Sequence, residues 1–199
     1  MALPSGYKKL KYIESYGQEY IETEVTATSS PAKLQIKLAL TSAAANQYIM
    51  GSYHFNLYCN GSIITADYVS SLTFIQGDNV ANTEIKELIY SSTAAYGRRT
   101  PLLANRHSTT IGNKTKARVY YAKMYDGNNL IRDFVPAMRK SDGAVGLYDL
   151  LNDVFYPNAN GGAFGYEIGS NVYYGDKTIE SAYLGGQEIE LSPIHYGGN

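Results

Sequence analysis

Polar and aromatic side chains alternate with apolar ones between residues 53 and 60 (YHFNLYCN). In a strand, His54, Asn56 and Tyr58 share one face, because successive side chains point to opposite sides. The alternate positions then face the core: Tyr53, Phe55, Leu57 and Cys59. Sugar binding needs flat aromatic rings beside amide or hydroxyl groups, because a pyranose ring presents a weakly polar C–H face and a ring of hydroxyls. The segment therefore predicts that His54, Asn56 and Tyr58 contact a carbohydrate.

A second group of candidate binding residues lies between residues 96 and 106. Glycine and proline interrupt this stretch, which predicts a loop, and binding residues concentrate on loops. Its aromatic and guanidinium side chains are expected to form a rim around the site: Tyr96, Arg98, Arg99 and Arg106. The 20 tyrosines of the chain suit subunit contacts equally well. Oligomer packing therefore stays open as the alternative use of these side chains.

Catalytic chemistry has weaker support in the sequence, and we predict no catalytic residue. A nucleophile would need a neighbouring histidine, yet no GxSxG motif accompanies His54, His107 or His195. Glycoside hydrolysis needs two carboxylates across a groove, for which Asp149 and Asp153 are the nearest candidates. The same segment (DLLND) is typical of a turn, because Asp and Asn side chains bond to the nearby backbone.

We predict no cofactor and no metal ligand set. Asp126-Gly127-Asn128-Asn129 offers the hard oxygen ligands that calcium prefers, so a calcium site there stays open as an alternative. The same four residues are accounted for as a hairpin turn. No GxGxxG or GxxxxGK phosphate loop is present, and the lone Cys59 allows no intramolecular disulfide.

Charge and hydropathy exclude several classes of partner. The chain has 17 Lys and Arg against 18 Asp and Glu, and the basic residues are scattered. Nucleic acid is therefore not an expected partner, and neither is an anionic membrane surface. No apolar stretch approaches the length of a membrane span. The first residues also lack the basic and apolar segments of a secretory signal, which predicts synthesis in the cytoplasm.

Period-two alternation and turn residues predict an all-β fold. The clearest strand is 34–40, with Leu34, Ile36, Leu38 and Leu40 on one face. Asn60-Gly61 predicts a hairpin turn before a return strand at 62–69, and a second hairpin joins 116–125 to 130–135. Shorter strands are expected at 18–25, 71–76, 145–149, 154–156 and 163–167. Residues 82–90 suit a short helix or a strand. Many short strands predict a sandwich or barrel.

The last thirty or so residues are expected to form a separate small unit. Residues 171–177 and 181–188 each combine an aromatic-containing strand with a glycine turn. We therefore predict a main domain at 1–167 and a C-terminal β-hairpin appendage with a tail at 168–199.

Two stretches resemble a family of phage and prophage structural proteins. The first is residues 3–15 (LPSGYKKLKYIES) with 18–23 (QEYIET). The second combines residues 117–120 (ARVY), 123–126 (KMYD), 130–136 (LIRDFVP) and 145–149 (VGLYD), followed by Phe155-Tyr156. The resemblance spans residues 3–165, with 41–116 similar in length and strand character alone. Residues 181–187 (SAYLGGQ) are similar to short modules that end many phage tail and baseplate proteins.

This resemblance implies a concanavalin A-like, or laminin-G-like, jelly-roll sandwich of two antiparallel sheets. It implies a virion protein of the phage tail, baseplate or capsid surface that binds host cell-surface polysaccharide without catalysis. It also implies contacts with other virion proteins, as a homo-oligomer or as part of a symmetric particle. The alternative is a structural or decorating component that packs against its neighbours. A polysaccharide depolymerase acting through Asp149 and Asp153 is a third hypothesis.

Overall fold

The computed structural model describes residues 2–26, 31–96 and 99–169, together with four short strands between residues 172 and 189. Across these described residues the chain forms strands and turns and no helix, which confirms the expected all-β class. Within the same ranges, nothing forms a helix long and apolar enough to cross a membrane. The chain divides into two compact units, residues 1–167 and 168–199.

The larger sheet of the first unit contains ten strands. Its main path consists, in spatial order, of β14 (Val154–Pro157), β13 (Val145–Asp149), β12 (Asn129–Arg139), β11 (Lys116–Asp126), β3 (Ala32–Leu40), β8 (Lys86–Ser92) and β7 (Val69–Gln76). Three strands attach beside this path: β1 (Tyr7–Lys9) on β12, β2 (Tyr12–Tyr16) on β11, and β15 (Gly165–Glu167) on β2. All of these pairings are antiparallel.

The smaller sheet of the first unit contains five strands. Their spatial order is β10 (Thr110–Gly112), β9 (Asn105–His107), β4 (Ala45–Ser52), β5 (Phe55–Asn60) and β6 (Ile64–Asp67). The pairings are antiparallel except for one parallel bridge between Gly51 and Asn105. The second unit contains two hairpins, β16 (Val172–Tyr174) with β17 (Lys177–Ile179) and β18 (Ala182–Leu184) with β19 (Gln187–Ile189).

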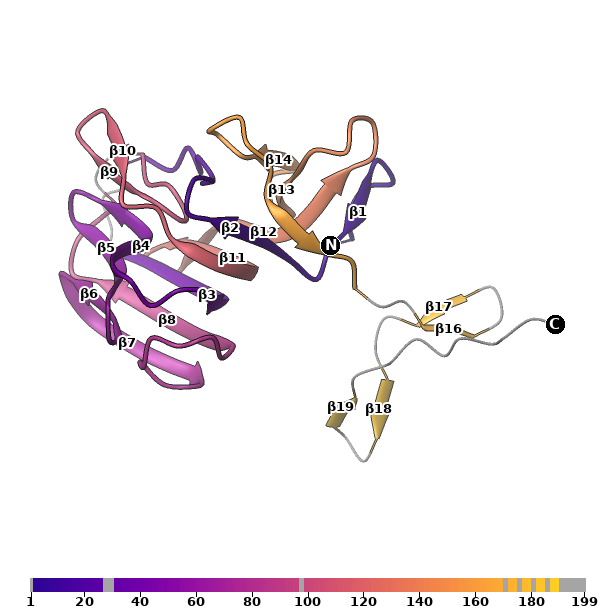
Figure 1. The fold of residues 1–199 in the computed structure, drawn as a ribbon, viewed down its shortest axis with the longest axis horizontal. Coiled ribbons are helices and arrows are strands. Elements are labelled where there is room, and N and C mark those ends of the chain that lie inside the picture. Colours follow the sequence, from indigo (N-terminus) through magenta and orange to yellow (C-terminus); the bar gives the residue numbers. More distant parts are fainter. Residues whose placement is uncertain are drawn as a thin grey trace. The chain divides into compact units, whose positions relative to one another are not determined.

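One hydrophobic core joins the two sheets of the first unit, as in a β-sandwich (Figure 1). The predicted alternation in β3 is confirmed, because Leu34, Ile36, Leu38 and Leu40 are all buried. Phe55 of the smaller sheet packs on Tyr90 of β8, with ring centroids 4.5 Å apart, and on Tyr96 at 4.8 Å. Aromatic contacts at this distance make Phe55 a central link between the sheets.

Several hairpins form where turn residues predict them. Gly61 adopts a φ of 101° after β5, a conformation that glycine reaches at little cost. Gly127 and Asn128 form the turn between β11 and β12, so the hairpin expected there is confirmed. β12 extends beyond its expected end through Pro136, because β1 and β13 pair with it around that proline.

Three expected elements differ in the structure. The strand expected at 53–60 begins at Phe55, because Tyr53 and His54 form the turn from β4. Residues 82–90 contain no helix, since β8 occupies Lys86–Ser92 between two antiparallel neighbours. The expected strand at 18–25 is replaced by irregular chain, in which Ile21 alone forms isolated bridges.

Lys86 places a charged side chain on the core side of β8. Its side chain is 1% exposed, and its Nζ donates a hydrogen bond of 3.1 Å to Oδ1 of Asp78. This bond, followed by one from the Val80 N–H, lowers the pKa of the Asp78 carboxyl. A buried ammonium needs such a partner, because desolvation disfavours its charge.

Protonation of Asp78 is expected to destabilise the fold in acid. Because folding lowers the pKa of Asp78, the carboxylate stabilises the folded state above its unfolded pKa, which is about 3.9. That stabilisation is lost as the pH falls through the lowered folded value. Asp78→Asn should reduce the free energy of unfolding at neutral pH, where Lys86 loses its charged partner, and should flatten the decline in acid.

Urea unfolding along a pH series measures both effects. Asp142→Asn is the matched control. Arg139 lowers the pKa of Asp142 to about 2, but both side chains of this pair face solvent, and such surface pairs contribute little to stability. Equal losses for the two variants at neutral pH would contradict the role assigned to Asp78.

Candidate functional site

A β-bulge in β4 brings two residues to the outer face of the smaller sheet. The register of β4 against β5 shifts between Tyr48 and Met50, so Ile49 and Met50 both lie in the core. Such an extra residue changes the side to which the following side chains point. Tyr48 and Gly51, three positions apart, therefore lie on the same outer face.

Gly51 forms the floor of this outer face. It pairs with Asn56 of β5 on one side and with Asn105 of β9 on the other. A Cβ at position 51 would lie 2.6 Å from Cδ1 of Tyr48 and 3.0 Å from Cβ of Asn105. The missing side chain thus leaves the space in which the Tyr48 ring and the Asn105 side chain lie.

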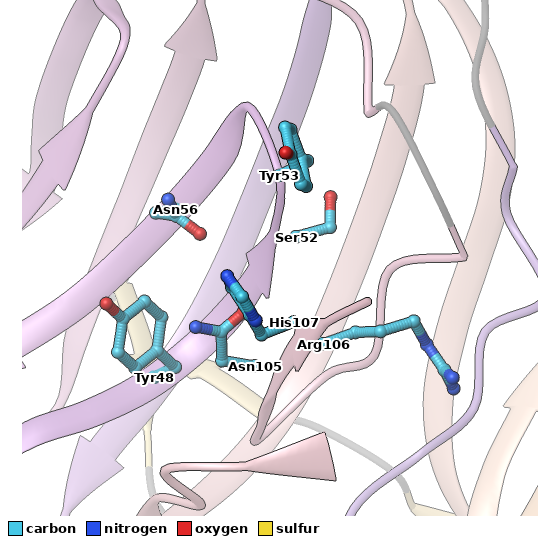
Figure 2. A pocket seen from close by; sticks show the side chains of 7 residues that line it. All are labelled: Tyr48, Ser52, Tyr53, Asn56, Asn105, Arg106 and His107. Carbon is cyan, nitrogen blue, oxygen red and sulfur yellow. The ribbon is translucent and has the colours of Figure 1, made fainter. Parts of the chain in front are cut away.

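A hollow of about 230 Å³ lies among the side chains around Gly51 (Figure 2). Seven residues from β4, β5, β9 and the turn after β4 line it: Tyr48, Ser52, Tyr53, Asn56, Asn105, Arg106 and His107. The lining thus combines aromatic rings with amides and hydroxyls, and none of its residues is acidic. These are the groups that a sugar ring needs, and they converge from segments far apart in the sequence.

Asp67 of β6 fixes the orientation of the Asn56 amide. Nδ2 of Asn56 donates to Oδ2 of Asp67 (3.4 Å), and the Tyr58 hydroxyl donates to Oδ1 (3.2 Å). Because an ionised carboxylate can only accept, the amide oxygen of Asn56 points the other way. The Oδ1 atom of Asn56 is shielded from solvent and has no hydrogen-bond partner among the described residues. Figure 2 shows it directed toward the middle of the hollow.

Tyr48 and Tyr58 form a stacked pair beside the hollow. Their ring centroids are 5.1 Å apart with an angle of 22° between the planes. Burial raises the pKa of both phenols, and the Asp67 carboxylate raises each further. Both hydroxyls therefore remain protonated at neutral pH, and the Tyr58 hydroxyl donates its proton to Asp67.

Of the residues predicted from the strand pattern, Asn56 and Tyr58 share the outer face of β5 as expected. Asn56 lines the hollow, while Tyr58 supports it through Tyr48 and Asp67. His54 lies in the turn after β4, where its ring packs edge-on against Tyr53 at 5.1 Å. Its place is beside the hollow rather than on the strand face.

The residues expected to form the rim do not lie together in the structure. Tyr96 is fully buried in the core, where its hydroxyl donates to the Lys33 carbonyl (2.7 Å) and accepts from the Tyr125 N–H (3.2 Å). Burial also raises the pKa of Tyr96 far above its ordinary value. The expected rim position of Tyr96 is therefore corrected: it is a core residue on an inward-folded loop. Arg98 lies outside the described residues, and Arg99 is exposed and does not line the hollow.

Arg106 lines the hollow with its stem. Its guanidinium forms an ion pair with Glu22, and Figure 2 shows it turned away from the other lining side chains. The charge thus ties β9 to the irregular segment around Glu22. The side chain shapes one wall of the hollow without presenting its charge there.

The two carboxylates considered for hydrolysis lie elsewhere. Asp149 is fully buried, and its Oδ1 accepts the N–H groups of Asp133 and Leu151, both at 3.0 Å. Asp153 has a φ of 59° in the following turn and accepts from the Tyr148 hydroxyl. These bonds support the interpretation of the segment as a structural turn, and neither carboxylate lines the hollow.

The described part of the chain contains no cluster of three or more His, Cys, Asp or Glu side chains that could hold a metal ion. Asp126 and Asn129 lie at the strand ends that flank the β11–β12 turn. Among the residues described there, Oδ1 of Asp126 is buried without a hydrogen-bond partner.

Five lining residues were not predicted as contacts: Tyr48, Ser52, Tyr53, Asn105 and His107. The alternation at 53–60 predicts Tyr53 on the core face, whereas Tyr53 and His54 form the turn that precedes β5. Tyr48 reaches the outer face through a bulge that leaves no mark in the alternation. Asn105 and His107 flank the predicted Arg106 in β9. Their position next to Arg106 is the one feature of the sequence that points to them as binding residues.

Comparison with protein-family models, with curated proteins and with solved structures finds no match for this chain.

Proposed function

We propose that the hollow on the outer face of the smaller sheet binds carbohydrate. The observation that carries the proposal is the arrangement around Gly51. The amide oxygen of Asn56 has no hydrogen-bond partner among the described residues, and aromatic rings and a second amide share the lining with it. This oxygen is shielded from solvent, so binding would have to uncover it before a sugar hydroxyl could supply the missing donor. The C–H face of the sugar would pack on an aromatic ring.

We further propose that the first unit is a concanavalin A-like jelly roll serving as an adhesion module of a phage particle. The resemblance of residues 3–23 and 117–156 to phage structural proteins supports this placement. The ligand would be a bacterial surface polysaccharide. A hollow of about 230 Å³ offers few contacts, so a single site would bind weakly. Repetition on a symmetric particle would then supply avidity.

An array of bacterial surface polysaccharides tests this function. The purified protein should retain a subset of the glycans, both with and without a chelator, because the hollow itself presents no acidic ligand for a metal ion. Binding lost on chelation would instead implicate a calcium site such as the one considered at Asp126. Absence of binding to every glycan would contradict the proposed function.

The exposed edge of β7 favours a second candidate function, packing against another copy of the chain. β7 pairs with β8 on one side, and no described strand pairs with its other side. Its eight residues (VSSLTFIQ) include no charge and no proline, and Val69 and Ile75 are 42% and 54% exposed. Such an edge is a template for strand pairing. A second copy fits it because two uncharged strands pair antiparallel about a two-fold axis without repulsion.

Ile75→Lys tests this second function. We expect the unmodified protein to sediment as a dimer, and the variant to shift to a monomer because a charge on an edge strand opposes pairing. Val154→Lys, on the short edge strand β14, is the matched control and should leave the dimer unchanged. A monomeric unmodified protein, or a dimer that survives Ile75→Lys, would contradict pairing through β7.

A further inference from the structure

A row of exposed aromatic rings leads away from the hollow. Tyr53 belongs to the lining of the hollow, and its ring packs edge-on against His54, with centroids 5.1 Å apart and an angle of 77°. His54 packs in the same manner against Tyr68, at 5.1 Å and 89°. We call Tyr53, His54 and Tyr68 the aromatic ridge. Tyr53 and Tyr68 are 54% and 50% exposed, so much of each ring faces solvent.

The backbone holds Tyr68 in an uncommon conformation. Tyr68 lies between β6 and β7, where the chain passes from the smaller to the larger sheet, and its φ is 54°. Positive φ is costly for a bulky residue. Its carbonyl accepts from the N–H of Thr93 (2.7 Å) and from the Thr93 hydroxyl (3.2 Å), which hold this conformation. Strain of this kind tends to persist where function requires it.

A second concavity lies where β3 and β7 begin and β8 ends, beside the β11–β12 turn. This groove has a volume of about 530 Å³, and its lining includes Lys33, Ser70, Ser92, Thr93 and Asn128. Two of these residues are bonded to the ridge, because Ser92 Oγ donates to the His54 carbonyl (3.2 Å) and Thr93 donates to that of Tyr68. The backbone of the ridge is therefore anchored by residues that line the groove, so the ridge lies between the hollow of the smaller sheet and the groove of the larger one.

The groove shares some hydrogen-bonding groups with the hollow. Its lining includes four hydroxyls and one amide, and it contains neither a carboxylate nor an aromatic ring. Its one lysine, Lys33, places Nζ over the Tyr125 ring, 4.4 Å from the centroid. The groove thus offers hydrogen-bonding groups of the kind that sugar hydroxyls use, as the hollow does.

We infer that the ligand is an extended glycan chain, bound along its length from the hollow across the aromatic ridge into the groove, rather than a single terminal sugar. This inference rests on the proposed function and names its substrate class. Successive rings would pack on Tyr53 and Tyr68, and the groove would take the rings beyond the ridge. A site for one terminal sugar would need neither the exposed rings of the aromatic ridge nor the groove.

Fragments of different length test the inference. A polysaccharide retained on the array is hydrolysed and fractionated, and the affinities of mono- or disaccharide fragments and of fragments of several repeat units are measured by calorimetry. Affinity should rise with length. Tyr68→Ala should weaken binding of the long fragments by about tenfold, the value of one aromatic contact, and should weaken the short ones less. Ser70→Phe, which fills the groove from an exposed position on β7, should act in the same direction.

Tyr166→Ala is the matched control, because Tyr166 is a similarly exposed tyrosine (46%) on β15 of the larger sheet. It should leave the affinity for both fragment lengths unchanged. Equal affinities for short and long fragments, or equal effects of Tyr68→Ala on both, would overturn the extended-chain inference while leaving the hollow as a terminal-sugar site. Failure of the protein to retain any polysaccharide would overturn the proposed function and this inference together.

Discussion

Replacing Phe55 by alanine is expected to lower the free energy of unfolding by about 3–5 kcal/mol, the usual cost of removing a buried phenylalanine. Phe55 is fully buried and contacts Tyr90 of the larger sheet and Tyr96 of the inward-folded loop. Its loss leaves a cavity between the two sheets, and the surrounding strands relax only in part. Urea unfolding followed by circular dichroism measures the change.

Phe155→Ala is the matched control for this prediction. Phe155 lies on β14 and is partly exposed, and it packs on Tyr7 at 5.3 Å. Truncation there should cost clearly less, because less apolar surface returns to water. A loss at Phe55 no larger than that at Phe155 would contradict the shared core of the two sheets.

Gly51→Ala is expected to abolish measurable binding to the glycans that the unmodified protein retains. The added Cβ would lie 2.6 Å from the Tyr48 ring and 3.0 Å from Asn105, both of which line the hollow. The Tyr48 ring must move away from the added Cβ, and because the Cβ of Asn105 moves only with its backbone, β9 must shift as well. We expect affinity to fall by at least about tenfold, the equivalent of one lost aromatic contact.

Gly112→Ala provides the control for Gly51→Ala on the same sheet. A Cβ at position 112 would meet nothing within 4 Å, so β10 accepts it without displacement. Calorimetric titration should show unchanged affinity for this variant, and thermal unfolding should show that both variants fold. If Gly51→Ala binds the glycan as tightly as Gly112→Ala does, the surroundings of Gly51 are not part of the binding site.

Much of the fold was predictable because strand alternation directly reflects burial. In β3, each apolar position of the pattern is a core position, and Gly61 and Gly127 occupy the turns that their conformations permit. The errors have local causes. The pattern at 53–60 continues through a turn, since Tyr53 has the polarity of a core residue and the exposure of a surface one.

The candidate site was only partly predictable, because it depends on contacts between distant segments. Asn56 and Tyr58 follow from the alternation of one strand. The position of Tyr48 in the site depends on the bulge in β4. The position of Asn105 depends on its bridge to Gly51, a residue far from it in the sequence. Tyr96 shows the opposite case, since its loop sequence suggested exposure and its ring fills the core. Whether a loop folds into the core depends on contacts with distant segments, which the local sequence does not show.

The most direct test of a carbohydrate site over Gly51 is an NMR titration of the ¹⁵N-labelled protein with a glycan retained on the array. We expect the largest shift changes at the side-chain amides of Asn56 and Asn105 and at the backbone amide of Gly51. The amides of β14 and β15 should remain unchanged. Changes confined to β7, to the second unit or to the β11–β12 turn, with Gly51 and Asn56 unaffected, would contradict the site.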